Sequence, residues 1–457
     1  MRPTFSLQSE KNEMAMKDKF GFLTVTSVVI ANMIGTGVFT SLGFQVMGIS
    51  SGFTLLLLWF LGGMVALCGA FAYSDLSNRF PRSGGEYNFL GRIYHPAIGF
   101  LAGWISITVG FAAPVAAAAI AFGRYFTSAI NLTTYFPDFF GHINIPVLLA
   151  ILLILFLTLL HSTNKQMGAI FQNTMTVIKI SFILLLFILG LIYGKNTGMS
   201  FFPDRKAWSE IISPPFVISM FFISFAYSGW NAAAYILSEI KNPSKNIARS
   251  LIIGTSFVIL LYMAINFIFL YAVPIPEIAG KIEVGVIFTQ KILGQSAGSF
   301  FGLIISFLLI SSVSSMIIVG PRVYHVIGED YPLLRWLARK NNDIPFVAIL
   351  FQSLISIIFI LTSTFEQVII FVGFTLNLFT FLTVLGVFVY RFRLQPGDKP
   401  LHNFGYPLLP GFFLLVNTWI LVYGLIYKPH ESLAGLLITL TGLGVYFLSR
   451  KGHTSHE

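Results

Sequence analysis

The chain consists largely of long apolar runs that alternate with short polar loops. We count about twelve such runs, and most approach the ~20 residues that an α-helix needs to cross a hydrocarbon core ~30 Å thick. Only 10% of the residues are charged and 56% are hydrophobic, whereas water-soluble domains carry about 25% charged residues. The sequence therefore predicts an all-α, multi-pass integral membrane protein that contacts the lipid bilayer.

The apolar runs give approximate bounds for the predicted spans. They lie near residues 20–42, 50–76, 88–122, 145–161, 168–193, 213–240, 247–273, 291–324, 344–362, 366–390, 408–427 and 432–449. The polar residues 1–19 are predicted to be a retained tail, since the apolar run after them is too long for a signal peptide. Residues 450–457 form a second short tail.

The positions of basic residues predict the orientation of the chain. Lys179 lies inside a span, and seven basic residues fall in loops on the side opposite to the N-terminus: Arg124, Lys195, Arg205, Lys206, Lys281, Lys291 and Lys428. All others of the 28 lie on the N-terminal side. Because cytoplasmic loops carry the excess of Lys and Arg, both termini are predicted to be cytoplasmic. No basic patch with interleaved aromatics occurs, so the net charge of +10 does not indicate a nucleic acid partner.

The first apolar run is interrupted in its middle by Gly35, Thr36 and Gly37. One interpretation is that the glycines permit close helix packing, which is common in membrane helices. The other is that the helix breaks there and exposes backbone N–H and C=O groups to a small polar ligand. Unpaired backbone at membrane depth is tolerated only where it lines a cavity or is buried in protein. If the second interpretation holds, we expect valine at either glycine to abolish the function of this stretch.

A second interruption favours the broken-helix interpretation. The sixth run contains the small and polar stretch Ser224–Asn231, which lies about 190 residues after the first interruption. Span starts recur at a similar offset, which indicates two repeats of five helices, 20–193 and 213–390, followed by two additional helices in 408–449. Since five is odd, the second repeat is inverted. Paired interruptions in inverted repeats indicate the binding site of a transporter.

Four motifs resemble those of the amino acid, polyamine and organocation (APC) superfamily. They are Ile34–Phe39, Phe80–Tyr87, Phe225–Asn231, and Glu239–Pro243 with Asn246-Ile247. Their order and spacing fit over residues 20–450, and the pattern is most similar to the L-type amino acid transporter and exchanger branch. The resemblance implies a five-plus-five inverted-repeat fold with broken first and sixth helices. It also implies amino acid transport by alternating access.

Helix ends explain how two such breaks bind a zwitterion. The outer half of the first helix begins with free N–H groups and a positive dipole end, which suit a carboxylate, while carbonyls at the end of the sixth helix suit an ammonium. The resemblance implies Met33, Ile34, Gly35, Thr36 and Gly37 on the carboxylate side and Phe225, Ala226 and Ser228 on the amino side. Phe225 would cover the substrate. Trp230 and Asn231 would lie near its side chain, although helix packing explains Trp230 equally well.

Lys179 lies deep inside the fifth span, where a charge costs at least ~2.5 kcal/mol. It could extend its side chain to the lipid headgroups. Alternatively, as an ammonium or a neutral amine, it bonds to the frayed first helix, and the resemblance implies that it replaces the sodium ion of sodium-coupled relatives. Ser312 and its neighbours Ser311, Ser314 and Ser315 would complete this polar corner, unless they bond only between helices.

The sequence thus predicts a transporter that binds an amino acid, not an enzyme. No zinc-protease motif, cysteine pair or phosphate-binding loop occurs, and Cys68 is the single cysteine, so neither cofactor nor metal is expected. Sodium-independent exchange and proton-linked uptake of neutral amino acids both remain open, as does a non-transporting amino acid sensor of the same fold. A cell membrane, plasma or bacterial inner, is the expected location, and the sequence does not predict the oligomeric state.

Overall fold

The computed structural model describes residues 19–130, 144–163, 167–341, 344–394 and 405–451. Most of the first predicted tail (1–19) and of the second (450–457) lies outside these ranges. The helices are α2 (Phe22–Met33), α3 (Gly37–Gln45), α4 (Gly52–Arg79), α5 (Glu86–Ile93), α6 (Pro96–Ile105), η1 (Ser106–Gly110), α7 (Ala112–Ile130), α10 (Ile145–Thr163), α11 (Met167–Tyr193), α12 (Arg205–Ile211), α13 (Pro214–Tyr227), α14 (Ala232–Tyr235), η2 (Leu237–Glu239), α15 (Pro243–Ala272), α16 (Ile275–Ile278), α17 (Val284–Leu293), α18 (Gln295–Asp330), η3 (Pro332–Ala338), α19 (Phe346–Thr362), α20 (Phe365–Phe392), α21 (Leu408–Tyr427) and α22 (Pro429–Lys451).

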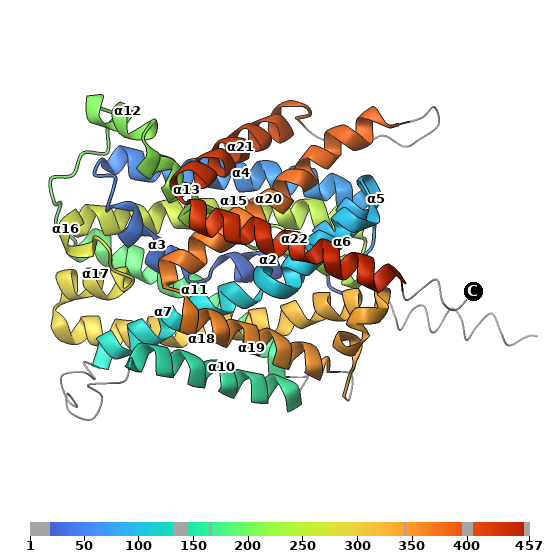
Figure 1. Cartoon of the computed structure of the whole chain (residues 1–457). Helices are drawn as coiled ribbons and strands as arrows, with labels where there is room; N and C mark the ends of the chain where they lie inside the picture. Colours follow the sequence, from blue (N-terminus) through green and yellow to red (C-terminus); the bar gives the residue numbers. More distant parts are fainter. Residues whose placement is uncertain (1–18, 131–143, 164–166, 342–343, 395–404, 452–457) are drawn as a thin grey trace, which may run out of the picture.

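These helices confirm the predicted all-α, multi-pass fold. Within the described ranges, ten stretches are long and apolar enough to cross a membrane, and the bent pair α12–α13 raises the number to 11. The shorter α19 occupies the ninth predicted range, so each of the predicted ranges contains a helix. Most long helices run roughly along one common direction, with α5 near one end and α16 near the other (Figure 1). We call these two ends the α5 face and the α16 face.

The third span begins later than the sequence pattern suggested. The predicted range 88–122 includes α5, but α5 is a separate short helix that ends at Ile93, and the spanning segment runs from Pro96 to Ile130. His95 has extended backbone and its side chain accepts a hydrogen bond from the N–H of Ala97, while Pro96 opens the new helix. Proline lacks the N–H of a helix interior and suits the first turn, so the chain restarts here.

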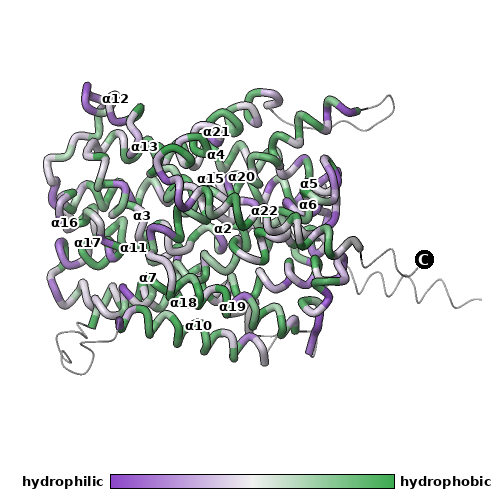
Figure 2. The backbone as a smooth tube through the Cα atoms, in the orientation of Figure 1, coloured by the Kyte–Doolittle hydropathy of each residue, from purple (hydrophilic) through white to green (hydrophobic). Residues whose placement is uncertain are grey.

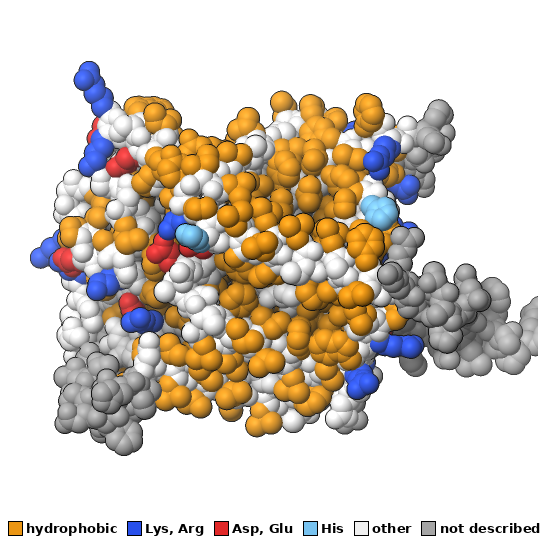
Figure 3. Space-filling view, in the orientation of Figure 1, with side chains coloured by type: hydrophobic (Ala, Val, Ile, Leu, Met, Phe, Trp, Pro, Cys, Tyr) orange, Lys and Arg blue, Asp and Glu red, His pale blue; other side chains and the backbone are white. Residues whose placement is uncertain are grey.

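The exterior of the helix bundle is apolar between its two faces. Large side chains of α10, such as Leu152, Phe156 and Leu159, are 51–68% exposed. Hydrophobic segments fill the middle of the bundle, and hydrophilic segments lie toward its two ends (Figure 2). In the space-filling view, hydrophobic side chains cover the middle and most charged residues lie toward the two faces (Figure 3). Such a large apolar surface fits lipid as the solvent.

The two interrupted helices lie side by side in the interior. α2 contacts α14 and α3 contacts α13, so the first and sixth spans run antiparallel. α15 packs along α2 and α4, and α18 packs along α7, which encloses the interruptions within the bundle. The boundaries of the two repeats, 20–193 and 213–390, stay a prediction.

Candidate functional site

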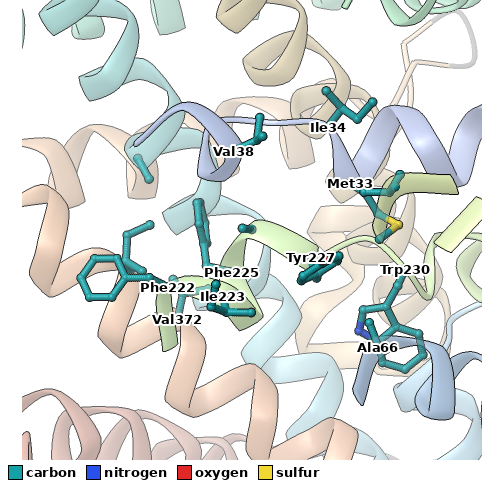
Figure 4. Close-up of a cluster of buried hydrophobic side chains, with 14 of the residues drawn as sticks. Met33, Ile34, Val38, Ala66, Phe222, Ile223, Phe225, Tyr227, Trp230 and Val372 are labelled. Carbon is teal, nitrogen blue, oxygen red and sulfur yellow. The ribbon is translucent and has the colours of Figure 1, made fainter. Parts of the chain in front are cut away.

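The first span breaks between Met33 and Gly37. Ile34 leaves the helical region with ψ 82°, and α3 resumes at Gly37 without a side-chain cap. Among the described residues, the backbone N–H groups of Thr36, Gly37 and Val38 have no acceptor. Figure 4 shows this non-helical stretch between Ile34 and Val38. The start of α3 therefore presents free donors and the positive end of a helix dipole.

The second break follows Tyr227 and is longer. Ser228 is extended, Gly229 has a φ of 101°, and only the four-residue α14 and the 3-10 turn η2 follow before the loop. The carbonyls of Phe225 and Tyr227 accept from the N–H groups of Ser228 and Trp230, at 3.0 Å and 3.3 Å. Each carbonyl keeps a second lone pair that an ammonium group can use.

Close packing and one hydroxyl hold the two breaks together. A Cβ atom on Gly37 would lie 2.4 Å from the Cα of Ala226, so only glycine allows this approach of α3 to α13. The hydroxyl of Tyr262 on α15 lies 2.6 Å from the carbonyl oxygen of Met33 and 3.1 Å from that of Ala226. Since a hydroxyl has one hydrogen, it donates to one carbonyl at a time.

A cavity of about 30 Å³ lies between the two breaks, and we call it the break cavity. Its lining contains eight of the predicted site residues: Met33, Gly35, Thr36, Gly37, Phe225, Ala226, Ser228 and Ser312. The free N–H groups of α3 and the carbonyl end of α13 therefore face one small space. This arrangement can bind a group with a positive and a negative end.

A second cavity of about 100 Å³ adjoins the break cavity and shares Asn32, Phe225 and Ser228 with it. We call it the side-chain cavity. Trp230 and Asn231 line it, together with α4, α20 and α21 residues. Trp230 also packs edge-on against Tyr73, with ring centroids 4.7 Å apart, so it serves both packing and the cavity wall.

Lys179 on α11 reaches the first break rather than the membrane surface. Its side chain is buried, at 2% relative exposure, and Nζ donates to the carbonyl of Ile34 at 3.1 Å and to Oγ of Ser312 at 2.9 Å. The alternative that this lysine extends to the headgroups is therefore wrong. Ile34 itself is fully buried, and its carbonyl is bound by Lys179.

Two of the neighbouring serines on α18 bond elsewhere, and Ser311 Oγ bonds to none of the described residues. Ser315 donates to the carbonyl of Ser312 at 2.9 Å, and Ser314 pairs with Nε2 of His161 at 2.8 Å. Of the four serines considered, only Ser312 bonds directly to Lys179 among the described residues. The polar corner around the lysine thus consists of one backbone carbonyl and one hydroxyl.

A larger cavity of about 560 Å³ leads from the site toward the α5 face, and we call it the vestibule. It shares Asn32 with both smaller cavities, and Glu239 and Arg322 lie along it. These two side chains are about half exposed and 3.8 Å apart. Toward the α16 face, by contrast, α3 is covered: Gly280 N–H donates to the carbonyl of Gly43 at 2.8 Å, and Tyr125 donates to that of Phe39 at 2.8 Å.

Polar contacts stabilise the loop between α4 and α5, which lies at the α5 face. Arg82 binds both carboxylate oxygens of Asp330 at 2.8–2.9 Å, and this hydrogen bonding raises the pKa of Arg82 above its ordinary value. Nearby, the N–H of Phe20 donates to the carbonyl of Glu239 at 2.8 Å, and the carbonyl of Phe20 accepts from the N–H of Lys241 at 2.9 Å. These bonds tie the start of the first span to the end of the sixth.

The residues predicted from the sequence thus come together around the two breaks, with Lys179 and Ile34 behind the break cavity. Sequence reasoning missed Tyr262, which is fully buried and bonds to both breaks. A tyrosine in an apolar span is a weak signal, although a buried hydroxyl generally needs a partner.

Comparisons with known proteins identify relatives over nearly the whole chain. A family described as "Amino acid permease" matches residues 20–447. The large neutral amino acids transporter small subunit 2 of Oryctolagus cuniculus is 28% identical over 95% of this chain and 81% of its own length. The b(0,+)-type amino acid transporter 1 of Homo sapiens is 25% identical over 97% and 90%, and the human cystine/glutamate transporter 24% identical over 96% and 86%.

The family match covers both interrupted helices and every span up to residue 447 in α22, in agreement with the observed fold. Transport, not catalysis or sensing, is the activity that these relatives share by name. The chain belongs to the amino acid permease family, and it is an amino acid transporter.

Proposed function

We propose that this permease carries neutral amino acids by alternating access without sodium, either in exchange for another amino acid or together with protons. The observation that carries the proposal is the break cavity, which is lined by Thr36 and Gly37 with free N–H groups and by the carbonyl end of α13. A zwitterion matches both sets of groups through its carboxylate and its ammonium. One of the reported relatives is named a transporter of large neutral amino acids, which supports a neutral substrate.

Lys179 takes the place of a sodium ion in this proposal. Its Nζ bonds to Ile34 and Ser312 from behind the first break, so a fixed cation supports the frayed backbone. The vestibule opens toward the α5 face, while the α16 side of the first span is covered. With the N-terminus in the cytoplasm of a cell, this is an inward-facing state, and transport requires a second state that opens to the other face.

Uptake into proteoliposomes tests the function. The purified chain should take up labelled leucine or alanine equally well in sodium and in choline chloride. Preloading with unlabelled amino acid identifies exchange, and an inward proton gradient identifies proton linkage. Specific binding without flux, or uptake that strictly requires sodium, would contradict the proposal.

Lys179→Ala tests the role of the lysine. The variant leaves two buried acceptors without their donor, each costing about 1–3 kcal/mol, so we expect uptake to fall about tenfold or more. Lys291→Ala is the matched control because that lysine is exposed and pairs with Glu277 on the α16 side. Parental uptake by Lys179→Ala would remove the lysine from the mechanism.

A further inference from the structure

A buried carboxylate forms part of the wall of the side-chain cavity. Glu86, the first residue of α5, is 5% exposed. Its Oε1 accepts from the hydroxyl of Tyr73 at 2.7 Å and from Nδ2 of Asn231 at 2.7 Å. Glu86 is the only charged residue among the described residues that line this cavity, and no Lys or Arg of the described ranges forms an ion pair with it.

The carboxylate determines which end of the Asn231 amide faces it. A carboxylate only accepts hydrogen bonds, so it requires the NH₂ group and not the carbonyl oxygen of the amide. Nδ2 also lies 3.3 Å from the hydroxyl of Tyr235, which occupies both of its hydrogens. Oδ1 is then the free polar atom of Asn231: no described residue donates to it, and it is not sealed from water.

Other polar side chains of the same cavity also donate hydrogen bonds to acceptors within the protein. Asn377 donates to Oγ of Ser224 at 3.2 Å, Thr380 to the carbonyl of Leu376 at 3.0 Å, and Asn417 to the carbonyl of Phe413 at 2.9 Å. The described wall of this cavity therefore contains no cation, and several of its N–H and O–H groups already donate within the protein. An acidic side chain would meet a carboxylate and an amide oxygen but no cation.

We propose that Glu86 is a specificity-determining positioning residue that orients the Asn231 amide, so that its oxygen faces the substrate side chain and acidic amino acids are rejected. The inference rests on the proposed function, since it requires that an amino acid side chain occupies this cavity. Glu86 acts through Asn231. A glutamine at position 86 can either accept from or donate to the Asn231 amide, so that amide is free to rotate. The selection against acidic amino acids is then weaker.

An exchange of acceptor and donor tests this pair. Asn231→Asp places two carboxylates face to face and removes a hydrogen bond to a charged group, so labelled leucine uptake should fall about tenfold or more. The double variant Glu86→Gln with Asn231→Asp restores one N–H···O bond in the reverse direction. We expect its uptake to recover at least about fivefold over Asn231→Asp. A double variant no better than Asn231→Asp would overturn the proposal.

Substrate selection provides the second readout. In Glu86→Gln alone, unlabelled glutamate should inhibit leucine uptake at concentrations about fivefold lower than in the parent, as expected for the loss of one charge contact. An unchanged ratio of glutamate to leucine inhibition would also overturn the proposal. Glu277→Gln, an exposed carboxylate near the α16 face, is the matched control and should leave the ratio unchanged. Loss of uptake in the parent would count against the proposed function instead.

Discussion

The two breaks differ in how their backbone groups are satisfied. In the first, helix resumes at Gly37 after only three intervening residues, and the N–H groups at the start of α3 have no acceptor among the described residues. In the second, irregular structure continues to α14, and N–H groups just beyond the break already bond the carbonyls of Phe225 and Tyr227. The first break thus offers unused donors, whereas the second offers carbonyls that are already partly used.

Because of this difference, the two breaks are expected to bind the two charged ends of an amino acid with unequal strength. In the proposed site, a carboxylate would gain new hydrogen bonds at α3, where no described residue competes for the donors. An ammonium group must share carbonyls with protein donors, including the hydroxyl of Tyr262. We therefore expect changes at the first break to reduce affinity more than changes at the second.

The largest expected effect is at the contact between the breaks. In Gly37→Ala the new Cβ would meet backbone and Cβ atoms of Ala226 at 2.4–2.6 Å, and backbone cannot move aside cheaply. Overpacking of this kind costs about 1–3 kcal/mol, so uptake should fall about 5- to 150-fold. Uptake and size-exclusion profiles in detergent measure function and folding separately.

Gly35→Ala is the matched control for this variant. The nearest atom to its new Cβ would be the carbonyl oxygen of Met33 at 3.9 Å, and Gly35 does not have a positive φ. The new methyl group meets no protein atom closely but lies at the break cavity, so uptake should fall less than in Gly37→Ala. The sequence alone suggested equal sensitivity of both glycines to valine. Equal losses in the two alanine variants would show that close packing of α3 does not distinguish them.

Tyr262→Phe has an intermediate expected effect and tests whether the two breaks act together. It removes a hydroxyl that bonds the carbonyls of Met33 and Ala226, and such a bond contributes about 0.5–1.5 kcal/mol. The KM should rise about two- to tenfold. Tyr271→Phe in the same helix, where the ring stacks on Phe267, is the control and should have no effect. An unchanged KM in Tyr262→Phe would mean that the breaks are held by packing alone.

Ser228→Gly has the smallest expected effect. Ser228 lines both cavities, and its hydroxyl bonds to none of the described residues, so its loss removes bulk and stiffness only. Extra backbone freedom costs about 0.5–1 kcal/mol, which corresponds to less than about fivefold in uptake. Large neutral amino acids should compete better, relative to small ones, than in the parent, because the loss of the Ser228 side chain enlarges the cavity. The opposite order would place Ser228 away from the substrate side chain.

Much of the fold could be predicted from the sequence because bilayer thickness fixes the length of each span. The predicted ranges all contain a helix, and the error at the third span arose because α5 is amphipathic and only Tyr94 and His95 separate it from the spanning segment. Hydropathy averages over neighbouring residues, so it did not register the restart at Pro96.

The candidate site was predicted only as a set of backbone breaks with one lysine. Glycines at membrane depth and a lysine at position 179 inside a span are local signals. They indicated where helices end and where a charge, which is costly to bury in the membrane, needs a partner. The partners themselves, Tyr262 for both breaks and Glu86 for Asn231, come from spans far apart in the sequence.

By itself, the sequence determined the membrane class, the helical architecture and the positions of the two interruptions, since these follow from hydropathy and from the conformational preferences of glycine. Only the tertiary structure decided which carbonyl Lys179 binds and which way the Asn231 amide points. It also decided that Gly37, but not Gly35, packs too closely against another helix to carry a Cβ atom. The physical reason is that hydrogen bonds and close contacts act over a few ångströms in space, and helix packing alone brings those atoms within range.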